Sequence, residues 1–218
     1  MRNPAAIVVK LGGSQAGRPH VGGWLEALAA CAGHVVLVPG GGPFADVVRT
    51  LQPKIGFDDI AAHHMALLAM EQFGRALASL RSGFELADSM AAIADALERG
   101  CVPVWAPLMM AARAADIPAS WDVTSDSLAA WLAGRLGVKR LVLVKQAPLS
   151  GSADARDLAE RGIVDPLFPH FLGISGAEAA IVAAHDHAVA RAIIRGGGLP
   201  GMRIAVQESA ARRLVSSP

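Results

Sequence analysis

Acidic and hydroxyl side chains crowd a short turn that leads into an apolar stretch near the middle of the chain. The turn reads Ser120-Trp121-Asp122-Val123-Thr124-Ser125-Asp126-Ser127, and Leu128-Ala129-Ala130-Trp131 follows it. One such oxygen can cap the free N–H groups of a helix start, so a richly furnished N-cap is one interpretation. Five oxygen-bearing side chains exceed what one cap requires. Two carboxylates four residues apart, beside hydroxyls, are suited to holding cations and hydroxyl groups around a phosphate in transfer.

Two glycine-rich loops in the N-terminal half complement this turn. Each follows a short β-branched run: the first is Lys10-Leu11-Gly12-Gly13-Ser14 and the second is Pro39-Gly40-Gly41-Gly42-Pro43. Glycine lets the backbone approach an anion closely, and the positive end of a following helix dipole favours the anion. Neither loop fits G-x-x-x-x-G-K-[ST] or G-x-G-x-x-G. A single such loop is usually an ordinary turn, but the pair, with Lys10 in one of them, indicates phosphate chemistry.

Alternating strand-like and helix-like segments position these residues. The expected strands are residues 7–9, 35–38, 102–105, 140–144, 180–183 and 203–206. The expected helices are residues 21–31, 44–51, 60–80, 90–99, 127–136 and 187–194. This alternation predicts an α/β fold with parallel strands and right-handed crossovers. Because ligands in such folds bind beyond the carboxyl ends of the strands, we expect Lys10, Gly40 to Gly42 and Lys145 to converge there.

Composition excludes several classes of function. The chain has 218 residues, of which 53% are hydrophobic and 18% charged, enough for the core of one α/β domain. A net charge of +1 without a basic stripe argues against a nucleic-acid partner. No segment reaches the roughly 20 apolar residues of a membrane span, and the first residues lack a signal-peptide core. We therefore expect a soluble, cytoplasmic protein without a membrane partner.

Other segments have plainer interpretations. Residues 146–165 are expected to form a loop or lid over the site, and residues 196–201 a surface turn before a last strand. The two pairs of neighbouring histidines lack a third ligand at metal-site spacing, so no metal site is predicted. Caps and surface positions are the favoured interpretation for these histidines. His64 stays a candidate for the site because its helix should lie close to the second glycine loop.

Three motifs, taken together, resemble the amino acid kinase superfamily. They are Val9-Lys10-Leu11-Gly12-Gly13-Ser14, Val38-Pro39-Gly40-Gly41-Gly42-Pro43-Phe44-Ala45-Asp46-Val47-Val48-Arg49, and Thr124-Ser125-Asp126-Ser127-Leu128-Ala129-Ala130. The resemblance implies a three-layer α/β sandwich with a mostly parallel central sheet. It also implies a single domain over residues 1–218, with an acceptor-binding lobe at about 1–135 and a nucleotide-binding lobe at about 136–218. The stretches around residues 120–128 and 164–169 most resemble the branch of this family that acts in archaeal methanofuran biosynthesis.

The resemblance assigns roles to individual residues. Lys10 would contact the transferring phosphoryl group and Asp126 would orient Lys10. The nucleotide phosphates would bind at Gly12, Gly13 and Ser14, with ATP as donor and Mg²⁺ as its ion. The acceptor would be held by residues of the second glycine loop, of the helices after it and of the acidic turn: Gly40, Gly41, Gly42, Arg49, His64, Asp122 and Thr124.

The chain also departs from the family pattern. Most relatives carry Thr-Asp-x-Asp-Gly after the strand that contains Leu141, where this chain reads Lys145-Gln146-Ala147-Pro148-Leu149. Many relatives place a phosphate-neutralising lysine near positions 173–180, where this chain has none. Lys145, at a strand end, is expected to take over that catalytic role.

Three functions remain open at this point. The favoured one is an ATP-dependent phosphotransferase acting on a small phosphorylated acceptor, in methanofuran or one-carbon cofactor biosynthesis. The alternative is a non-catalytic relative that binds a small molecule or serves as an assembly subunit in the same pathway. A nucleoside monophosphate kinase is less favoured, since no Asp/Asn-rich segment for reading a base is visible. The apolar helix at 60–80 predicts a homodimer, as is usual in this family, with burial inside one monomer as the other possibility.

Overall fold

A central sheet runs through the part of the chain that the computed structural model describes, residues 6–13, 17, 19–146 and 153–206. Its strand order is β3-β4-β2-β1-β5-β6-β7. The strands are β1 (Ile7–Leu11), β2 (Val35–Pro39), β3 (Phe84–Ala87), β4 (Val102–Trp105), β5 (Arg140–Lys145), β6 (Glu178–Ala183) and β7 (Met202–Ile204). Neighbouring strands are parallel except β6 and β7, which are antiparallel. The mostly parallel sheet expected from the sequence is confirmed.

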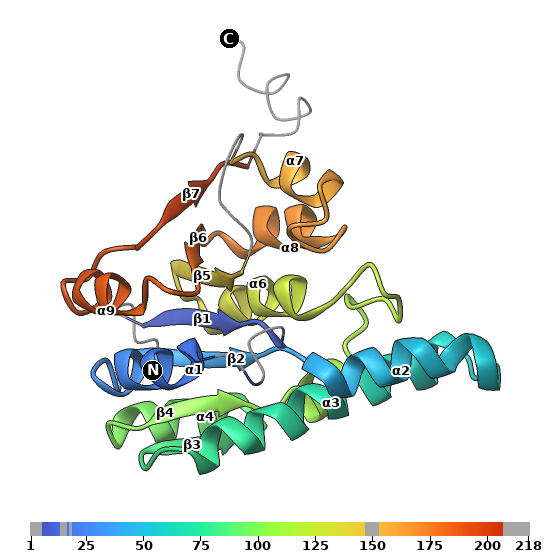
Figure 1. Cartoon of the computed structure of the whole chain (residues 1–218), viewed down its shortest axis with the longest axis horizontal. Helices are drawn as coiled ribbons and strands as arrows, with labels where there is room; N and C mark the ends of the chain where they lie inside the picture. The colour runs from blue at the N-terminus through green and yellow to red at the C-terminus, as the bar shows by residue number, and fades with distance from the viewer. Residues whose placement is uncertain (1–5, 14–16, 18, 147–152, 207–218) are drawn as a thin grey trace, which may run out of the picture.

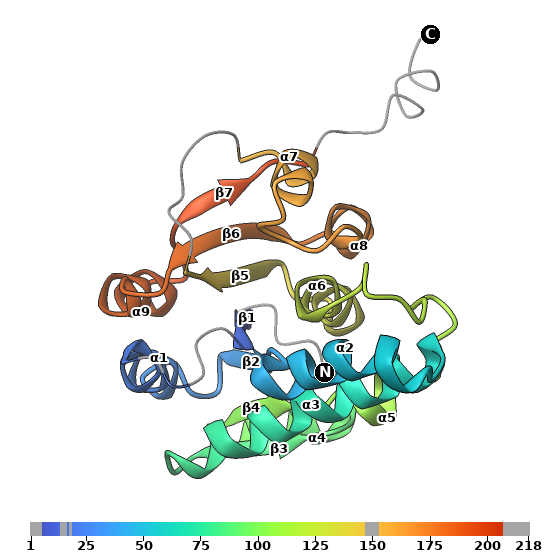
Figure 2. The same cartoon turned by 45° about the vertical axis from the view of Figure 1, so that its right-hand side comes forward.

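Helices cover both faces of the sheet and complete a three-layer sandwich (Figures 1 and 2). Figure 2 shows α1 and α9 on one side of the sheet and α6 and α8 on the other. The helices are α1 (His20–Ala29), α2 (Gly42–Ile55), α3 (Asp59–Ser79), α4 (Met90–Glu98), α5 (Leu108–Ala111), α6 (Ser125–Leu136), α7 (Ala155–Glu160), α8 (Phe168–Ser175) and α9 (His187–Arg195). In Figure 1, α2 and α3 lie side by side and extend beyond the sheet.

The core lies on both faces of the central strands. Every residue of β1 and of β2 is buried, as expected for parallel strands covered on both sides. Because successive side chains of a strand point to opposite faces, Val8 packs toward α6 and α8 while Ile7 and Val9 pack toward α1 and α9. Helices on the two faces thus fix the central strands, whose carboxyl ends carry the candidate site.

The structure differs from the sequence-based expectation in five elements. Strand β3 and helices α5 and α8 were not expected, and β7 runs antiparallel to β6 rather than parallel. Helix α7 lies inside the stretch 146–165, for which a loop or lid was expected. Its Asp154 caps the helix by accepting hydrogen bonds from the N–H groups of Arg156 and Asp157. The residues of that stretch at 147–152 lie outside the described part.

Two further expectations concern the surface. The segment after α9 does form a turn before the last strand, but Leu199 and Pro200 within it are buried. In the described part, no helix is long and apolar enough to cross a membrane.

Candidate active site

Two lysines lie at or next to the carboxyl ends of two neighbouring parallel strands, on the same side of the sheet. Lys10 is the fourth residue of β1, and Lys145 is the last residue of β5. The parallel register pairs Leu11 with Val144, which places the two lysines close together across the ladder. Lys10 is 5% exposed and the side chain of Lys145 is 16% exposed. Ammonium groups at such depth require a compensating charge.

Asp126 supplies that charge from the first turn of α6. Its carboxylate lies between the two lysines, with Oδ1 2.9 Å from Nζ of Lys10 and Oδ2 2.6 Å from Nζ of Lys145. Asp126 itself is 4% exposed. The structure therefore brings together the three residues that the sequence predicted as the catalytic group. Two lysine side chains thus converge on one carboxylate, an arrangement that suits the approach of a phosphate.

The protonation states follow from burial and these charges. Burial alone would raise the pKa of Asp126, but the charges and hydrogen bonds of Lys10 and Lys145 outweigh it and lower that pKa to about 2. Burial lowers the pKa of Lys10, and the charge of Asp126 opposes this change. Asp126 is thus a carboxylate at neutral pH.

The side chains of Lys10, Asp126 and Lys145, called the Asp126 cluster below, determine which chemical groups can bind beside them. Oδ1 of Asp126 is buried and lies 2.9 Å from Nζ of Lys10, and Oδ2 accepts a hydrogen bond from Lys145. The described residues include no group of three or more His, Cys, Asp or Glu side chains that could hold a metal ion. Because both oxygens of Asp126 face lysines, this cluster fits phosphate oxygens and does not fit a directly bound Mg²⁺.

A second buried carboxylate, Asp165, caps the start of α6. The N-cap residue Thr124 makes no side-chain capping bond of its own. Instead, Oδ2 of Asp165 accepts hydrogen bonds from the Thr124 N–H at 3.0 Å, the Thr124 hydroxyl at 2.9 Å and the Ser127 N–H at 3.0 Å. Oδ1 accepts a short hydrogen bond from the Ser127 hydroxyl. Burial and the nearby charge of Asp126 raise the pKa of Asp165, while the Ser127 and Thr124 hydrogen bonds oppose the rise.

The two glycine loops touch each other, backbone against backbone. A Cβ atom added to Gly13 would lie 2.0 Å from the nitrogen of Gly42, and one added to Gly40 would lie 2.3 Å from the nitrogen of Gly13. Gly42 also has a φ of 56°, in the left-handed region that favours glycine. Contact between the loops explains why glycine stands at these positions. It brings the ends of β1 and β2 together at the start of α2.

A small pocket lies beside this contact. Its volume is about 210 Å³. Gly13, Gly41, Gly42, Arg49 and Thr124, all predicted from the sequence, line it. Its apolar wall comes from α2, α3 and α6 and the turn before α6, and comprises Ala45, Ala66, Leu67, Met70, Val123 and Leu128. The pocket thus combines a backbone suited to binding anions with a wall suited to a small apolar group.

His63 is a pocket residue that the sequence analysis missed. It lines the pocket and is 9% exposed, and its Nε2 atom is buried without a hydrogen-bond partner among the described residues. Burial lowers the pKa of His63, and the neighbouring His64 lowers it further. The adjacent His64, which the sequence favoured, has its Nε2 atom 3.3 Å from the carbonyl oxygen of Ala112 and does not line the pocket.

Three other predicted residues occupy different surroundings. Asp122 is exposed and does not line the pocket. Gly12 and Gly40 are buried at the loop contact and likewise stand back from the pocket. The predicted phosphate ligand Ser14 lies outside the described residues.

Arg49 and Trp121 form the rim of the pocket. The Arg49 guanidinium lies 4.4 Å from the centroid of the Trp121 ring, a cation–π arrangement. Nε1 of Trp121 donates a hydrogen bond to Oε1 of Gln52 at 2.6 Å. The indole is therefore held from two sides where it faces the pocket.

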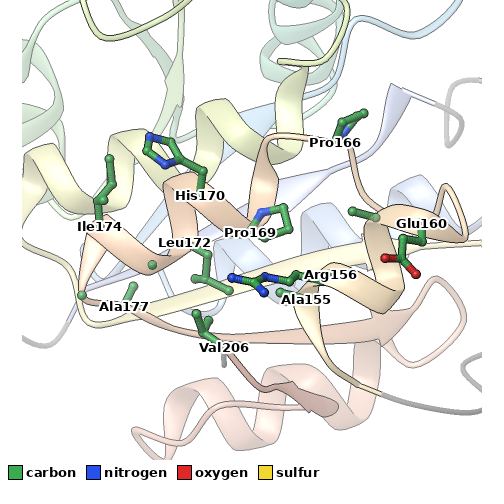
Figure 3. Close-up of a pocket in the computed structure, with 13 residues that line it drawn as sticks. Ala155, Arg156, Glu160, Pro166, Pro169, His170, Leu172, Ile174, Ala177 and Val206 are labelled. Atoms are coloured by element: carbon green, nitrogen blue, oxygen red, sulfur yellow. The ribbon is translucent and has the colours of Figure 1, made fainter. Parts of the chain in front are cut away.

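A larger groove lies elsewhere, between α7 and α8 (Figure 3). Its volume is about 930 Å³, and its lining includes Arg156, Glu160, His170, Leu172 and Val206. None of the predicted site residues lines it. Size alone would favour this groove as a ligand site, but residues of both glycine loops line the smaller pocket instead. Lys10, Asp126 and Lys145 line neither cavity.

Comparison with known proteins agrees with this geometry. The model of the amino acid kinase family matches residues 5–148, about two thirds of the chain. The chain belongs to the amino acid kinase family. This match includes Lys10, both glycine loops, Asp126 and Lys145, but it ends before Asp165.

Individual members of the amino acid kinase family are also similar. A [5-(aminomethyl)furan-3-yl]methyl phosphate kinase from Methanocaldococcus jannaschii is 25% identical over 149 residues, which cover 63% of this chain and 68% of that protein. The uridylate kinase of Archaeoglobus fulgidus has the same fold, with a TM-score of 0.69 and 15% identity over 92% of this chain and 100% of that one. An isopentenyl phosphate kinase aligns with a TM-score of 0.59 and 16% identity, over 91% of this chain and 100% of that one.

Proposed function

We propose that this member of the amino acid kinase family transfers a phosphoryl group from ATP to a small acceptor that already carries a phosphate. The observation that carries the proposal is the buried cluster of Lys10, Asp126 and Lys145 beside the two touching glycine loops. Phosphoryl transfer depends mainly on positioning and on neutralising charge, and this cluster is suited to both.

The donor side is built from the first glycine loop and the two lysines. Backbone N–H groups of Gly12 and Gly13 would hold the β- and γ-phosphates of ATP. Lys10 and Lys145 would neutralise the transferring group and the charge that develops on the leaving ADP. Mg²⁺ would enter bound to the nucleotide, where it neutralises phosphate charge.

The acceptor side is the pocket lined by Gly41, Gly42 and His63. Its volume of about 210 Å³ is below the roughly 300 Å³ at which sites for drug-sized ligands begin, which favours a small monoester over a nucleotide. The backbone N–H groups and Arg49 would hold the acceptor phosphate, while the apolar wall and Trp121 would hold a flat ring. The name of the Methanocaldococcus jannaschii relative describes such a molecule. We infer that [5-(aminomethyl)furan-3-yl]methyl phosphate, or a close analogue from methanofuran or one-carbon cofactor synthesis, is the acceptor.

The chemical step needs no general base. An oxygen of the acceptor phosphate attacks the γ-phosphorus, and a new P–O bond forms as the bond to the β,γ-bridging oxygen breaks. ADP leaves with the electron pair. Because a phosphate monoester has a second pKa near 6, its oxygen is already anionic at neutral pH.

The direct test is to incubate the protein with ATP, Mg²⁺ and [5-(aminomethyl)furan-3-yl]methyl phosphate and to follow diphosphate formation by ³¹P NMR. Lys10→Ala should reduce turnover on the order of a hundredfold or more, because transition-state charge stabilisation is lost. Lys145→Met should reduce turnover, or raise the KM for ATP, by at least about tenfold. Lys139→Met, an exposed position, is the matched control. Unchanged turnover in both site variants would remove the lysines from the mechanism.

One observation favours a second function. The chain carries no lysine at positions 173–180 and has an altered segment after Val144, so a small-molecule binding protein or assembly subunit of the same pathway is the alternative. Calorimetry separates the two functions. If ATP does not bind, with or without Mg²⁺, while the acceptor does, the binding protein replaces the kinase.

A further inference from the structure

The cap of α6 comes from a distant part of the chain. Asp165 lies between α7 and α8, 38 residues beyond Ser127 and 41 beyond Thr124. It is 8% exposed, and its two oxygens accept four hydrogen bonds from those two residues. A local N-cap usually accepts one bond from the first turn. Four hydrogen bonds to one buried carboxylate constrain the orientation of the first turn of α6 more tightly than an ordinary N-cap does.

Asp126 lies within the capped turn. Its neighbours on both sides, Ser125 and Ser127, are buried, and Ser127 is 0% exposed. Because Asp165 holds the backbone at Thr124 and Ser127, it fixes the direction in which the intervening Asp126 side chain leaves the helix. That direction determines whether one carboxylate can lie 2.9 Å from Lys10 and 2.6 Å from Lys145 at the same time.

We propose that Asp165 is a positioning residue of the reacting centre, which acts by holding the first turn of α6 so that Asp126 stays between Lys10 and Lys145. The segment between α7 and α8 is thereby tied to the ends of β1 and β5. The kinetic part of the proposal rests on the proposed kinase function, whereas its structural part does not.

Two substitutions at Asp165 separate position from charge. Asp165→Asn can keep all four contacts: its amide oxygen replaces Oδ2, and its NH₂ group donates to a reoriented Ser127 hydroxyl. Asp165→Ala removes all four contacts. Asp157→Ala, which loses an exposed ion pair with Arg161 on α7, is the control from the same segment. A positioning role predicts that the asparagine variant is rescued and the alanine variant is not.

The first measurement needs no substrate. The chain has only four lysines, Lys10, Lys54, Lys139 and Lys145, so their side-chain signals can be resolved in protein labelled with ¹³C at lysine Cε. In Asp165→Ala we expect the Lys10 and Lys145 signals to move, while the signals of Lys54 and Lys139 stay in place. Asp165→Asn and Asp157→Ala should leave all four signals close to those of the unsubstituted protein.

The second measurement is kinetic, with ATP and [5-(aminomethyl)furan-3-yl]methyl phosphate. Asp165→Ala should lower kcat on the order of tenfold or more and change the acceptor KM by a smaller factor, since among the described residues that line the pocket Thr124 alone donates hydrogen bonds to Asp165. Asp165→Asn should stay within about threefold of the unsubstituted protein, because a factor of three is worth well under the 1.4 kcal/mol of a tenfold change. If Asp165 had a purely structural role, Asp165→Ala would lower the amount of folded protein, and the folded fraction would keep the kcat and KM of the unsubstituted protein.

The outcomes are distinguishable. Unchanged Lys10 and Lys145 signals in folded Asp165→Ala overturn the proposal, whatever the activity. If Asp165→Ala does not fold, Ser127→Ala decides: deleting the hydroxyl donor to Oδ1 should move the same two lysine signals by a smaller amount, and no movement overturns the proposal. If the unsubstituted protein transfers no phosphate, the proposed function fails, and the lysine signals still decide the role of Asp165.

Discussion

The carboxylate of Asp126 stays ionised in a buried position because two ammonium groups face it. Its pKa of about 2 lies below the usual 3.8, so the folded protein binds the Asp126 proton less readily than the unfolded chain does. Ionised Asp126 therefore stabilises the fold above the unfolded pKa. That stabilisation is lost as the pH falls from about 4 to about 2.

We predict a measurable pH dependence from this single residue. A shift of nearly two units corresponds to roughly 2 kcal/mol. Between pH 5 and pH 2, the free energy of unfolding of the unsubstituted protein should fall by about that amount more than that of Asp126→Asn. Urea unfolding at several pH values would measure both proteins. Parallel pH profiles would contradict the ion-pair assignment.

At the scale of residues, the sequence predicted that the two lysines lie close together, but it did not predict the pocket histidine or the carboxylate that caps α6. Lys10 and Lys145 could be brought together from the sequence because parallel strands end at one edge of a sheet. The choice between His63 and His64 could not be made, because adjacent helix positions face directions about 100° apart. The rotation of α3 is set by tertiary packing, mainly against α2 and the sheet. The cap by Asp165 is a tertiary contact across about 40 residues, and no local pattern announces it.

The touching glycine loops are the feature that matters most at the scale of elements. They join the ends of β1 and β2 without side chains, so the first turn of α2 can begin directly beside Gly13. Close backbone approach at this point positions the proposed donor and acceptor sides next to each other.

We predict that Gly13→Ala separates the loops and abolishes phosphoryl transfer, because its Cβ would meet the Gly42 nitrogen at 2.0 Å. The matched control is Gly22→Ala in α1, where a Cβ atom meets nothing within 4 Å. That change should leave turnover intact and stabilise the protein by up to about 1 kcal/mol, the difference in helix propensity. Turnover and thermal unfolding of both variants give the answer, and a fully active Gly13→Ala would show that the loops can part without harm.

Elements with a strong local pattern were predictable and the others were not. The β-branched runs of β1, β2 and β5 are typical of buried parallel strands. Strand β3 reads Phe-Glu-Leu-Ala and has no β-branched residue, so only its pairing with β4 makes it a strand. Helix α8 is only eight residues long and contains Gly173, which local propensity disfavours. Burial of Phe168 and Phe171 outweighs this preference.

On the scale of the whole molecule, α2 and α3 carry large apolar side chains that their packing within the monomer does not bury. Large side chains of these helices that remain exposed are Phe44, Val47, Ile55, Ile60, Met65 and Leu68. Met70 and Phe73 of α3 are buried within the monomer. Some apolar side chains of α3 are thus buried within the monomer, and the exposed ones are available for contact with a partner.

We predict a homodimer that uses this exposed part of α2 and α3. Light scattering should give twice the chain mass of 22.5 kDa, and Leu68→Glu should shift the protein toward the monomer because it places a charge in an apolar contact. Val189→Glu on α9, which is 60% exposed, serves as the control and should leave the mass unchanged. A mass near 22.5 kDa at micromolar concentration for the unsubstituted protein would exclude the dimer.

The central place of β1 in the sheet has a consequence for the order of folding. Its residue Val9 pairs with Leu37 on one side and with Val142 on the other. During synthesis the β1–β2 ladder can therefore form early. The other edge of β1 stays unpaired until β5, at residues 140–145, has been made. Contacts between such distant segments close slowly, and an unpaired edge attracts other strands in the meantime. The proposed reacting centre, which spans β1 and β5, therefore forms only after β5 has been made.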